Sequence, residues 1–559
     1  MFQIHNTLTK QKEKFIPVNK KLVRIYVCGP TVYDFAHIGN FRSWLTADIL
    51  HRWLRYGLGH QVKLVKNITD VGHLTQDDIE TSEDKIEHAA KKQAKTPQEI
   101  ARFFEQAFLQ DEAQLNILPA AVYPRATDNI SQMIAIIKTL LDKGLAYEKN
   151  GSVFYDVTKF KNYGMLSGNT LDRLETGARL KPHPDKKHPY DFALWLKANP
   201  DHLLQWDSPW SRGYPGWHIE CSAMSIRYLS SAFVHSGATP ERVLGVAGRR
   251  SWKDESLRLS HETVPCSRVT SDNRLSPVTP TSFQPDKFQT IDFHTGGEDN
   301  IFPHHENEIA QSEGATDKQF VKYWLHTKHL LVDGQKMSKS LGNFYTLRDL
   351  VAKNYNPLAF RLLMLSSHYR SQVNFTFNGL DQAQTALNRI NDFMTTLRSR
   401  IVVRSEAERS EESPEKPHNT RDSSSANGLR RMTEKTQKDF ESNLNDDLNT
   451  PQAVAVVFNF IHDINKITET EHSSISPNNA KTIYDLMLKF DKILGLCLNK
   501  IQRSKTQNKI PQKIQKLFNK RNQARQQKNF GLADALRQQI SQLGYQILDT
   551  DQESKLEKL

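Results

Sequence analysis

The sequence predicts an α/β fold with a parallel sheet near the N-terminus and mostly helical structure from about residue 375 onward. Short apolar segments over 22–27 and 61–68 are typical of buried strands, and a helical pattern covers 40–56 between them. A strand, a helix and a second strand in this order form a βαβ unit, whose strands lie parallel. The helix carries one apolar stripe at four-residue spacing, made of Phe41, Leu45, Ile49 and Trp53.

The next segments differ in character. Residues from about 80 to 145 look helical and charged, those from about 150 to 210 are mixed, and an apolar run, Gln289–Phe293, precedes a pair of glycines. Residues 231–290 and 403–430 are polar, with little periodicity, and we expect both to be disordered.

Composition bounds the function. The 559 residues allow several domains, and 38% apolar residues with a mean hydropathy of −0.61 indicate a polar protein. No run approaches the roughly 20 apolar residues of a membrane helix, and the N-terminus lacks the apolar core of a secretory signal. Four cysteines are too few for a disulfide framework, so we expect a cytoplasmic protein without a membrane partner.

Positive charge is concentrated near the C-terminus. The net charge is +12, and the segment Lys500–Lys528 holds ten Lys or Arg residues and no acid. Apolar residues recur around it at near-helical spacing, which predicts a basic helical module that could contact phosphates of a nucleic acid. The alternative is an ordinary solvated helix face.

Two motifs suit phosphate chemistry. HIGN, residues 37–40, stands where the first predicted helix begins, and a helix N-terminus offers free N–H groups to an anion. KMSKSLGN, residues 336–343, describes a cationic loop that could close over a polyphosphate. The alternatives are a histidine that only caps the helix and an ordinary surface loop.

Two further motifs are weaker when taken alone. In HHENE, His304 and Glu308 are four residues apart and share one helix face, so they could hold one metal ion or simply form a surface ion pair. In HTGGED, Gly296 and Gly297 follow an apolar run, and Asp299 could accept hydrogen bonds from a ribose. A glycine pair after a strand is more often only a turn.

Together and in this order, the motifs resemble the class I aminoacyl-tRNA synthetases, and within them the cysteinyl-tRNA synthetase family. The resemblance covers nearly the whole chain except 231–290 and 403–430. The matching segments are YVCGPTVYDFAHIGN, NITDV, PGWHIECSAMS, FHTGGEDNIFPHHENEIAQSE, KMSKSLGN, LNDDLNTPQAV and FGLADALRQQI.

The resemblance implies an α/β organisation. A Rossmann-like parallel-sheet catalytic domain over 1–335 would contain a connective insertion at about 110–205 and the segment 231–290. A stem-contact fold with the KMSKS loop would follow over 336–385, and an α-helical bundle over 386–500 with the linker 403–430. The basic segment 501–559 would be the anticodon-binding module.

The resemblance also implies site residues. The ligands of one Zn²⁺ would be Cys28, Cys221, His304 and Glu308. The residues at the ATP phosphates, and so the catalytic ones, would be His37, Asn40, Lys336 and Lys339. Those facing the adenosine would be Gly296, Gly297 and Asp299, and those lining the amino-acid pocket Thr69 and Trp217.

The implied reaction is the ATP-dependent ligation of L-cysteine to tRNA(Cys) through a cysteinyl-adenylate, with Mg²⁺ on the ATP, by a monomer. The first step, formation of the cysteinyl-adenylate, needs positioning and charge stabilisation rather than a protein nucleophile. Zinc would separate cysteine from serine, because a thiolate binds Zn²⁺ far better than a hydroxyl, while an apolar pocket separates close analogues by only about 1–3 kcal/mol.

The chain departs from the family in three places, one of which is the segment Gly72–Thr75 after NITDV, where acidic residues are commoner in the family. Asn40 stands where many class I enzymes have a second histidine, and about 60 residues are inserted at 231–290. Lengthening a loop from about 10 to about 70 residues costs only about 1.7 kcal/mol, so we expect the site to survive. Two alternatives stay open: a tRNA-independent ligase that joins cysteine to an amino-sugar, and a tRNA-binding relative inactivated by the insertion.

Overall fold

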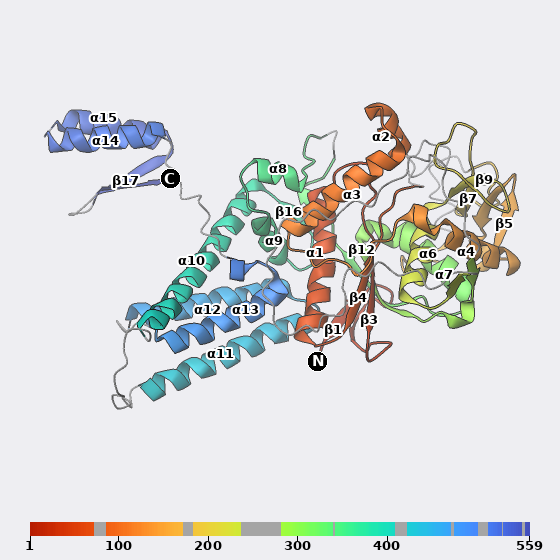
Figure 1. Cartoon of the computed structure of the whole chain (residues 1–559), viewed down its shortest axis with the longest axis horizontal. Coiled ribbons are helices and arrows are strands. Elements are labelled where there is room, and N and C mark those ends of the chain that lie inside the picture. The colour runs from red at the N-terminus through yellow and green to blue at the C-terminus, as the bar shows by residue number, and fades with distance from the viewer. Residues whose placement is uncertain are drawn as a thin grey trace. The chain divides into compact units, whose positions relative to one another are not determined.

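The computed structural model describes residues 1–71, 85–171, 183–235, 281–338, 341–407, 422–470, 475–500, 512–527, 529–549 and 554–558. The chain divides into two compact units, Met1–Leu498 and Asn499–Leu559 (Figure 1). None of the helices in the described ranges combines the length and the apolar character that crossing a lipid bilayer requires.

A parallel sheet carries the N-terminal part of the first unit. Its strands lie in the order β13-β12-β3-β4 and all neighbours are parallel. Helix α1 (Ile38–Arg52) connects β3 to β4 and continues as one wider turn over Trp53–Gly57, so the predicted βαβ unit is confirmed. The strand bounds are β3 Val23–Val27, β4 Val62–Lys66, β12 Ile291–Gly297 and β13 Val321–Thr327.

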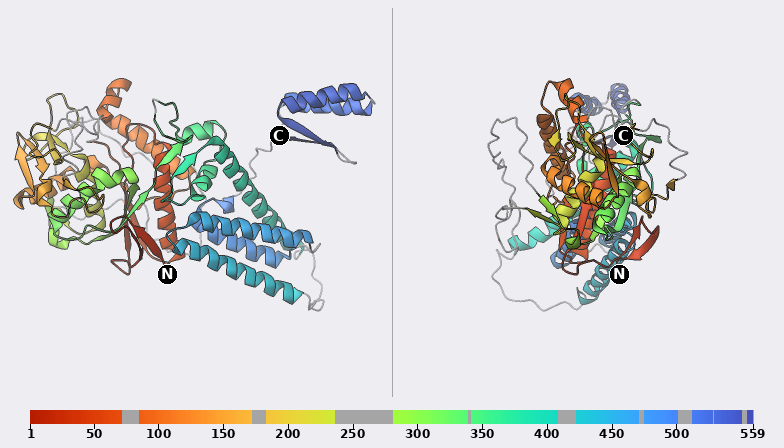
Figure 2. Two further views of the ribbon diagram at one scale, coloured as in Figure 1. Left: turned by 180° about the vertical axis from the view of Figure 1, so that it is seen from behind. Right: turned by 90° about the vertical axis from the view of Figure 1, so that its right-hand side faces the viewer.

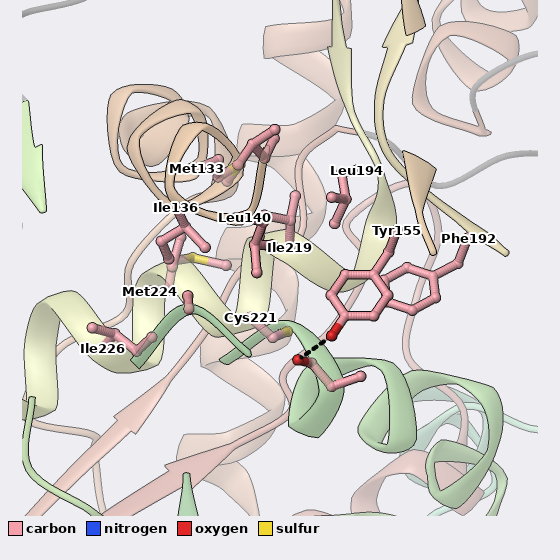
Figure 3. Packing of buried hydrophobic residues seen from close by; sticks show 14 of the residues in the cluster. Met133, Ile136, Leu140, Tyr155, Phe192, Leu194, Ile219, Cys221, Met224 and Ile226 are labelled. Carbon is pink, nitrogen blue, oxygen red and sulfur yellow. Dashed lines mark hydrogen bonds between the residues drawn. The ribbon is translucent and has the colours of Figure 1, made fainter. Parts of the chain in front are cut away.

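Between β4 and β12 the chain builds helices and an antiparallel sheet of order β5-β6-β7-β9-β8. Apolar side chains of α4, α6 and this sheet pack into one core, in which the rings of Tyr155 and Phe192 stack at 4.9 Å (Figure 3). The hydroxyl of Tyr155 donates to the carbonyl of Ala310, which ties the sheet to α7. The bounds are α2 Lys85–Gln93, α3 Pro97–Gln114, α4 Ile130–Asp142, β5 Ala146–Lys149, β6 Ser152–Tyr155, β7 Phe192–Lys197, β8 Trp206–Asp207, β9 Arg212–Pro215, α6 Trp217–Leu229 and α7 Glu306–Thr316.

The predicted irregular segment 231–290 is ordered at both ends. Strands β10 (Phe233–His235) and β11 (Thr281–Phe283) pair antiparallel, with His235 opposite Thr281. The expectation of disorder was therefore wrong for these flanks, because three backbone residues on each side find ladder partners in each other. Residues 236–280, where the rest of that prediction falls, lie outside the described residues.

The C-terminal part of the first unit is helical, as predicted (Figure 2). The expected linker 403–430 is shorter than predicted, because α10 runs to Ala407 and α11 begins at Asp422, while 408–421 lie outside the described residues. Once a helix is nucleated, each further residue adds a hydrogen bond at little cost, so polar sequence can prolong it. The helices are α8 Leu347–Ala352, α9 Pro357–Leu365, α10 Phe377–Ala407, α11 Asp422–Asn445, α12 Thr450–Thr470 and α13 Pro477–Leu494.

The first unit also contains two small sheets, one at the N-terminus and one that follows the parallel sheet in the sequence. A hairpin of β1 and β2 opens the chain, and β14 pairs with both β15 and β16 after the parallel sheet. The carboxylate of Asp447, after α11, accepts from the amide of His5 in β1 at 2.8 Å and from Arg370 at 2.7 Å. The bounds are β1 Gln3–Asn6, β2 Gln11–Lys14, β14 Leu330–Val332, β15 Gln335–Lys336 and β16 Val373–Phe375.

A buried ion pair joins the α/β part to the helical part. The guanidinium of Arg361 in α9 is fully buried and donates to Asp48 of α1 at 2.6 Å, to the carbonyl of Leu115 at 3.0 Å and to that of Leu494 at 2.6 Å. Asp48 also accepts from Arg52 at 2.8 Å. Burial alone would raise the pKa of Asp48, but the two arginines lower it to about 2.

The second unit is a small α/β module. Helices α14 (Gln512–Gln526) and α15 (Phe530–Gln542) precede a hairpin of β17 (Tyr545–Asp549) and β18 (Ser554–Lys558). Its core contains Ile514, Phe518, Ile540 and Ile547. The sequence did not predict this hairpin.

We predict that Arg361→Met destabilises the first unit by about 3–5 kcal/mol, because it leaves a buried carboxylate with one partner fewer. Urea unfolding followed by tryptophan fluorescence checks this, since every tryptophan lies in that unit. The control Arg430→Met removes an exposed ion pair with Glu434 and should change stability by less than about 1 kcal/mol. Equal effects of the two variants would contradict the prediction.

The same pair predicts a pH dependence. The pKa of Asp48 is lower in the folded protein than its ordinary value of 3.8, so its contribution to stability is present above about pH 4 and is lost as the pH falls toward 2. Removing Arg361 should flatten this part of the stability curve, and an unchanged acid limb would contradict the assignment.

We also predict that replacing residues 236–280 by Asn-Gly leaves the first unit folded. His235 and Thr281 are directly opposed, so a two-residue turn can close the β10–β11 hairpin. The melting temperature and the circular dichroism spectrum check this. A loss of cooperative melting would show that the segment is needed for the fold.

Candidate metal and nucleotide site

The sequence-predicted residues gather at one edge of the parallel sheet. Cys28 follows the last residue of β3, Gly296 and Gly297 end β12, and Thr69 comes shortly after β4. Because the carboxyl ends of parallel strands lie at the same edge, these segments are neighbours although they are far apart in the sequence. Thr31 and Thr69 pair as an isolated parallel bridge, which confirms this for two of the segments.

Four of the predicted residues meet in one cluster. Ligand atoms of Cys28, Cys221, His304 and Glu308 all lie within 4.8 Å of one another. The last three side chains are buried and Cys28 is partly exposed, so a small molecule could approach from the side of Cys28. Two thiols, an imidazole and a carboxylate are donors that Zn²⁺ accepts, and tetrahedral zinc spaces its ligands by about 3.3–3.8 Å. The donor set therefore fits a metal ion.

Neighbouring side chains fix the imidazole of His304. Its Nε2 lies 3.0 Å from Oε1 of Glu308, one helical turn later. The ring of Trp217 stacks on it with centroids 4.4 Å apart, and Nδ1 of His218 lies 2.9 Å from its Nδ1. The side chains at the start of α6 therefore hold a residue in the turn Ile301–His305, just before α7.

The electrostatics of the cluster are those of closely packed donors. The hydrogen bond with Cys28 and burial raise the pKa of Cys221 well above its usual value. Burial would lower the pKa of His304, but Glu308 and Cys221 raise it to about 10. Burial would raise the pKa of Glu308, but His294 and His304 lower it to about 2. The thiol and imidazole protons are those that a bound metal ion would displace.

Sequence reasoning missed a second group of histidines beside the cluster. His294 Nε2 lies 3.1 Å from Oε2 of Glu308, and His305 Nε2 lies 3.2 Å from Sγ of Cys28. His305 in turn meets His326 at 2.7 Å. His294 and His305, with Cys28 and Glu308, form another set of atoms close enough to hold a metal ion. Both stand in the quoted motifs HTGGED and HHENE, which was the available signal.

The HIGN motif opens α1, as the sequence predicted. His37 is the N-cap residue: its Nδ1 accepts from the amide of Asn40 at 3.2 Å, and Oδ1 of Asn40 accepts from the amide of His37 at 3.1 Å. Since Nδ1 accepts, the neutral ring carries its proton on Nε2. His37 therefore caps α1 through Nδ1, and Nε2 is the donor atom of this side chain.

The KMSKS segment lies against HIGN. A Cβ on Gly39 would come within 3.1 Å of the Met337 side chain, and Ile38 donates its amide to the carbonyl of Tyr345 at 2.9 Å. Lys336 is exposed at the end of β15. Lys339 lies outside the described residues.

The glycine pair has a packing reason at this position. A Cβ on Gly296 would lie 2.8 Å from the ring of His305, and the amide of Gly297 donates to Asn300 at 3.0 Å. Asp299 is exposed beside the pair. The glycines are thus the last two residues of β12 rather than a turn after it, and Asp299 is accessible to a ligand.

The two residues predicted for the amino-acid pocket each contact a segment that carries a cluster residue. Trp217 is partly exposed against His304, and Thr69 is buried beside the segment that carries Cys28. The amide of Thr69 donates to the carbonyl of Pro30 at 3.0 Å.

Comparison with known families and proteins covers nearly the whole chain. Residues 14–240 and 281–385 match the family described as tRNA synthetases class I (C) catalytic domain, and residues 439–499 match the DALR domain family. The catalytic match leaves out residues 241–280 and resumes at Thr281, the first residue of β11.

Similar proteins that align over the full length of the chain are cysteine–tRNA ligases. The chain is 38% identical over 557 residues to the cysteine–tRNA ligase of Caldicellulosiruptor saccharolyticus, covering 100% of both chains. It is also 38% identical over 560 residues to that of Chlamydia felis, covering 100% of this chain and 98% of that protein. The fold is shared with methionyl-tRNA synthetase of Mycobacterium tuberculosis in complex with methionyl-adenylate, with a TM-score of 0.52 and 11% identity over 85% of this chain and 90% of that one. The chain belongs to the cysteine–tRNA ligase family of the class I tRNA synthetases.

Proposed function

We propose that this chain ligates L-cysteine to tRNA(Cys) with ATP, through a cysteinyl-adenylate, and releases AMP and pyrophosphate. The observation that carries the proposal is the cluster of Cys28, Cys221, His304 and Glu308 at the carboxyl edge of the sheet, where α/β folds bind nucleotides. Full-length identity of 38% to cysteine–tRNA ligases supports it.

The proposed resident ion is one Zn²⁺ held by these four side chains. The set with both thiols suits zinc better than the set with His294 and His305, because two thiolates neutralise the ion and are the softer ligands. His294 and His305 would then not bind the ion themselves. They contact the zinc ligands Glu308 and Cys28 and fix the orientation of these side chains. When bound, the ion would prefer the thiolate of cysteine to the hydroxyl of serine.

Side chains of the protein would bind the phosphates of ATP. Nε2–H of His37 and the side-chain Nδ2 of Asn40 would donate to ATP phosphates at the start of α1, where the helix dipole adds positive charge. Lys336 and Lys339 would bring two further charges to the phosphates, with Mg²⁺ on the ATP.

The nucleoside and the amino acid would flank this phosphate site. Gly296, Gly297 and Asp299 would face the adenosine, with the exposed carboxylate of Asp299 available to ribose hydroxyls. Trp217 and Thr69 would line the cysteine pocket. Positioning of two bound substrates supplies the acceleration, since a carboxylate oxygen of cysteine attacks the α-phosphate without a protein nucleophile.

The proposed domain roles follow the family. Residues 1–335 form the catalytic domain, with the connective insertion at about 110–205 and the inserted segment within 231–290. Residues 336–385 form the stem-contact fold with the KMSKS loop, and 386–500 the helical bundle. The module 501–559 reads the anticodon. A monomer and a cytoplasmic location remain predictions.

Two rivals are kept. A ligase that joins cysteine to an amino-sugar would need the same cluster but no basic C-terminal module, and here α14 exposes Lys516 and Lys520. An inactive relative would have lost its ligands through the insertion, but here the four proposed ligands still lie together.

Charging of total tRNA by the purified chain with labelled cysteine, and with serine as control, tests the proposal. Charging with cysteine alone is the expected result. If cysteine drives ATP–pyrophosphate exchange without charging, the amino-sugar ligase is favoured. If neither occurs, the inactive relative is correct.

We predict that Cys28→Ser weakens zinc binding by more than about 100-fold, because it replaces a thiolate ligand, and loss of an outer partner alone costs up to that much. Metal analysis after dialysis against a chelator gives the stoichiometry, expected near one per chain for the unchanged protein. The control Cys497→Ser alters a cysteine outside the cluster and should keep its zinc. Full zinc content in Cys28→Ser would refute the ligand set.

We further predict that Lys516→Gln with Lys520→Gln raises the KM for tRNA and reduces the slope of log KM against log salt by about two. Both side chains are exposed on α14. ATP–pyrophosphate exchange should not change, because it needs no tRNA. The matched control is Lys481→Gln with Lys489→Gln, on α13, and equal tRNA effects in both pairs would contradict a tRNA role for α14.

A further inference from the structure

The buried side-chain carboxamide of Asn67 holds the backbone segment that carries Cys28. Asn67 stands just after β4 and its side chain is 2% exposed. Its Oδ1 accepts from the amide of Gly29 at 2.8 Å, and its Nδ2 donates to Oγ1 of Thr69 at 3.0 Å. A backbone amide can only donate, so the first bond fixes which way the carboxamide points and makes Nδ2 the donor to Thr69.

The two segments joined by Asn67 run side by side. Thr69 donates its amide to the carbonyl of Pro30 at 3.0 Å, and Val32 donates to the carbonyl of Thr69 at 3.1 Å. A Cβ on Gly29 would lie 1.7 Å from the carbonyl oxygen of Asn67, so this approach requires glycine there. The spacing between the segment of Cys28 and the segment of Thr69 is therefore tightly set.

The backbone of Cys28 is held from its other sides as well. Its amide donates to the carbonyl of Thr295 in β12 at 3.1 Å, and its carbonyl accepts from the indole of Trp44 in α1 at 2.8 Å. With the bond from Gly29 to Asn67, backbone groups of residues 28 and 29 are bonded to three segments: β12, α1 and the residues after β4. The Sγ of Cys28 is thus placed by a rigid backbone as well as by its own rotamer.

We propose that Asn67 is a positioning residue that sets the metal-ligand loop at Cys28 and the hydroxyl of Thr69 at the same time. It acts through Gly29 and Thr69, and it couples the geometry of the metal cluster to that of the amino-acid pocket. This inference rests on the proposed function, since it takes cysteine as the molecule bound between them. The bond from Nδ2 occupies one lone pair of Thr69 Oγ1 and thereby orients the hydroxyl proton.

Two substitutions separate the two bonds. Asn67→Asp keeps an oxygen toward the amide of Gly29 and removes the donor to Thr69, while Asn67→Ala removes both bonds. We expect Asn67→Asp to raise the KM for cysteine in ATP–pyrophosphate exchange about tenfold and to change zinc affinity little. Asn67→Ala should raise the KM for cysteine and the zinc dissociation constant, each about tenfold or more. The KM for ATP should stay unchanged in both.

A matched control is available in Asn129→Ala. Asn129 is fully buried, donates to the carbonyl of Arg125 at 2.7 Å and accepts from Arg227 at 3.0 Å, outside the predicted site. Zinc affinity is measured by competition with a chromogenic chelator, which needs no activity. The control should lower the melting temperature without changing the KM for cysteine or zinc affinity.

The outcomes are distinct. If both Asn67 variants match the control in cysteine KM and zinc affinity, the positioning role is wrong. If Asn67→Ala fails to fold, the isosteric Asn67→Asp decides by its KM split between cysteine and ATP. If the unchanged protein shows no cysteine-dependent exchange, the proposed function fails, and the zinc competition alone still accepts or rejects the role of Asn67 at Cys28.

Discussion

The molecule is organised around one geometric requirement: four donor atoms from separate segments must come within 4.8 Å of one another. Cys28 comes from the end of β3, Cys221 from α6, His304 from the turn Ile301–His305 before α7, and Glu308 from the start of α7. The parallel sheet fixes the first, and the core between α4, α6 and the antiparallel sheet fixes the second (Figure 3). The insertion between Cys221 and His304 is compatible with this because β10 and β11 bring its flanks back together.

Burying so many polar groups would be costly without partners. In this structure the buried groups contact one another in series. Glu308 contacts His294 and His304, Cys28 contacts His305, and His305 contacts His326. The last ring meets Thr7 in the turn between β1 and β2 at 2.8 Å. The side chains of the metal cluster are thus linked to the N-terminal hairpin of β1 and β2. A separate ion pair, between Asp48 of α1 and Arg361 of α9, links the α/β part to the helical part.

What the sequence could predict depended on whether the signal was local. The strand 22–27, the helix after HIGN and the parallel pairing followed from periodicity, and β3, α1 and β4 confirm them. The spacing of His304 and Glu308 placed both on one turn, but no spacing argument could bring Cys28 and Cys221 to them. Only the family resemblance did so, because tertiary contacts between distant segments leave no local pattern.

The misses have the same origin. The flanks of 231–290 looked irregular because two three-residue strands are stable only through each other, which periodicity over a longer window does not detect. Asn67 attracted no notice within NITDV, since a single carboxamide acts through partners in another segment. His326 lies in β13, outside every motif, and it became visible only beside His305.

The most direct test of the account is X-ray absorption at the zinc edge of the purified full-length protein, without amino acid, with cysteine and with serine. The account predicts two sulfur ligands near 2.3 Å in the free protein, from Cys28 and Cys221. It predicts three with cysteine and two with serine. A sulfur count that stays at two with saturating cysteine would contradict selection of the substrate through its thiolate.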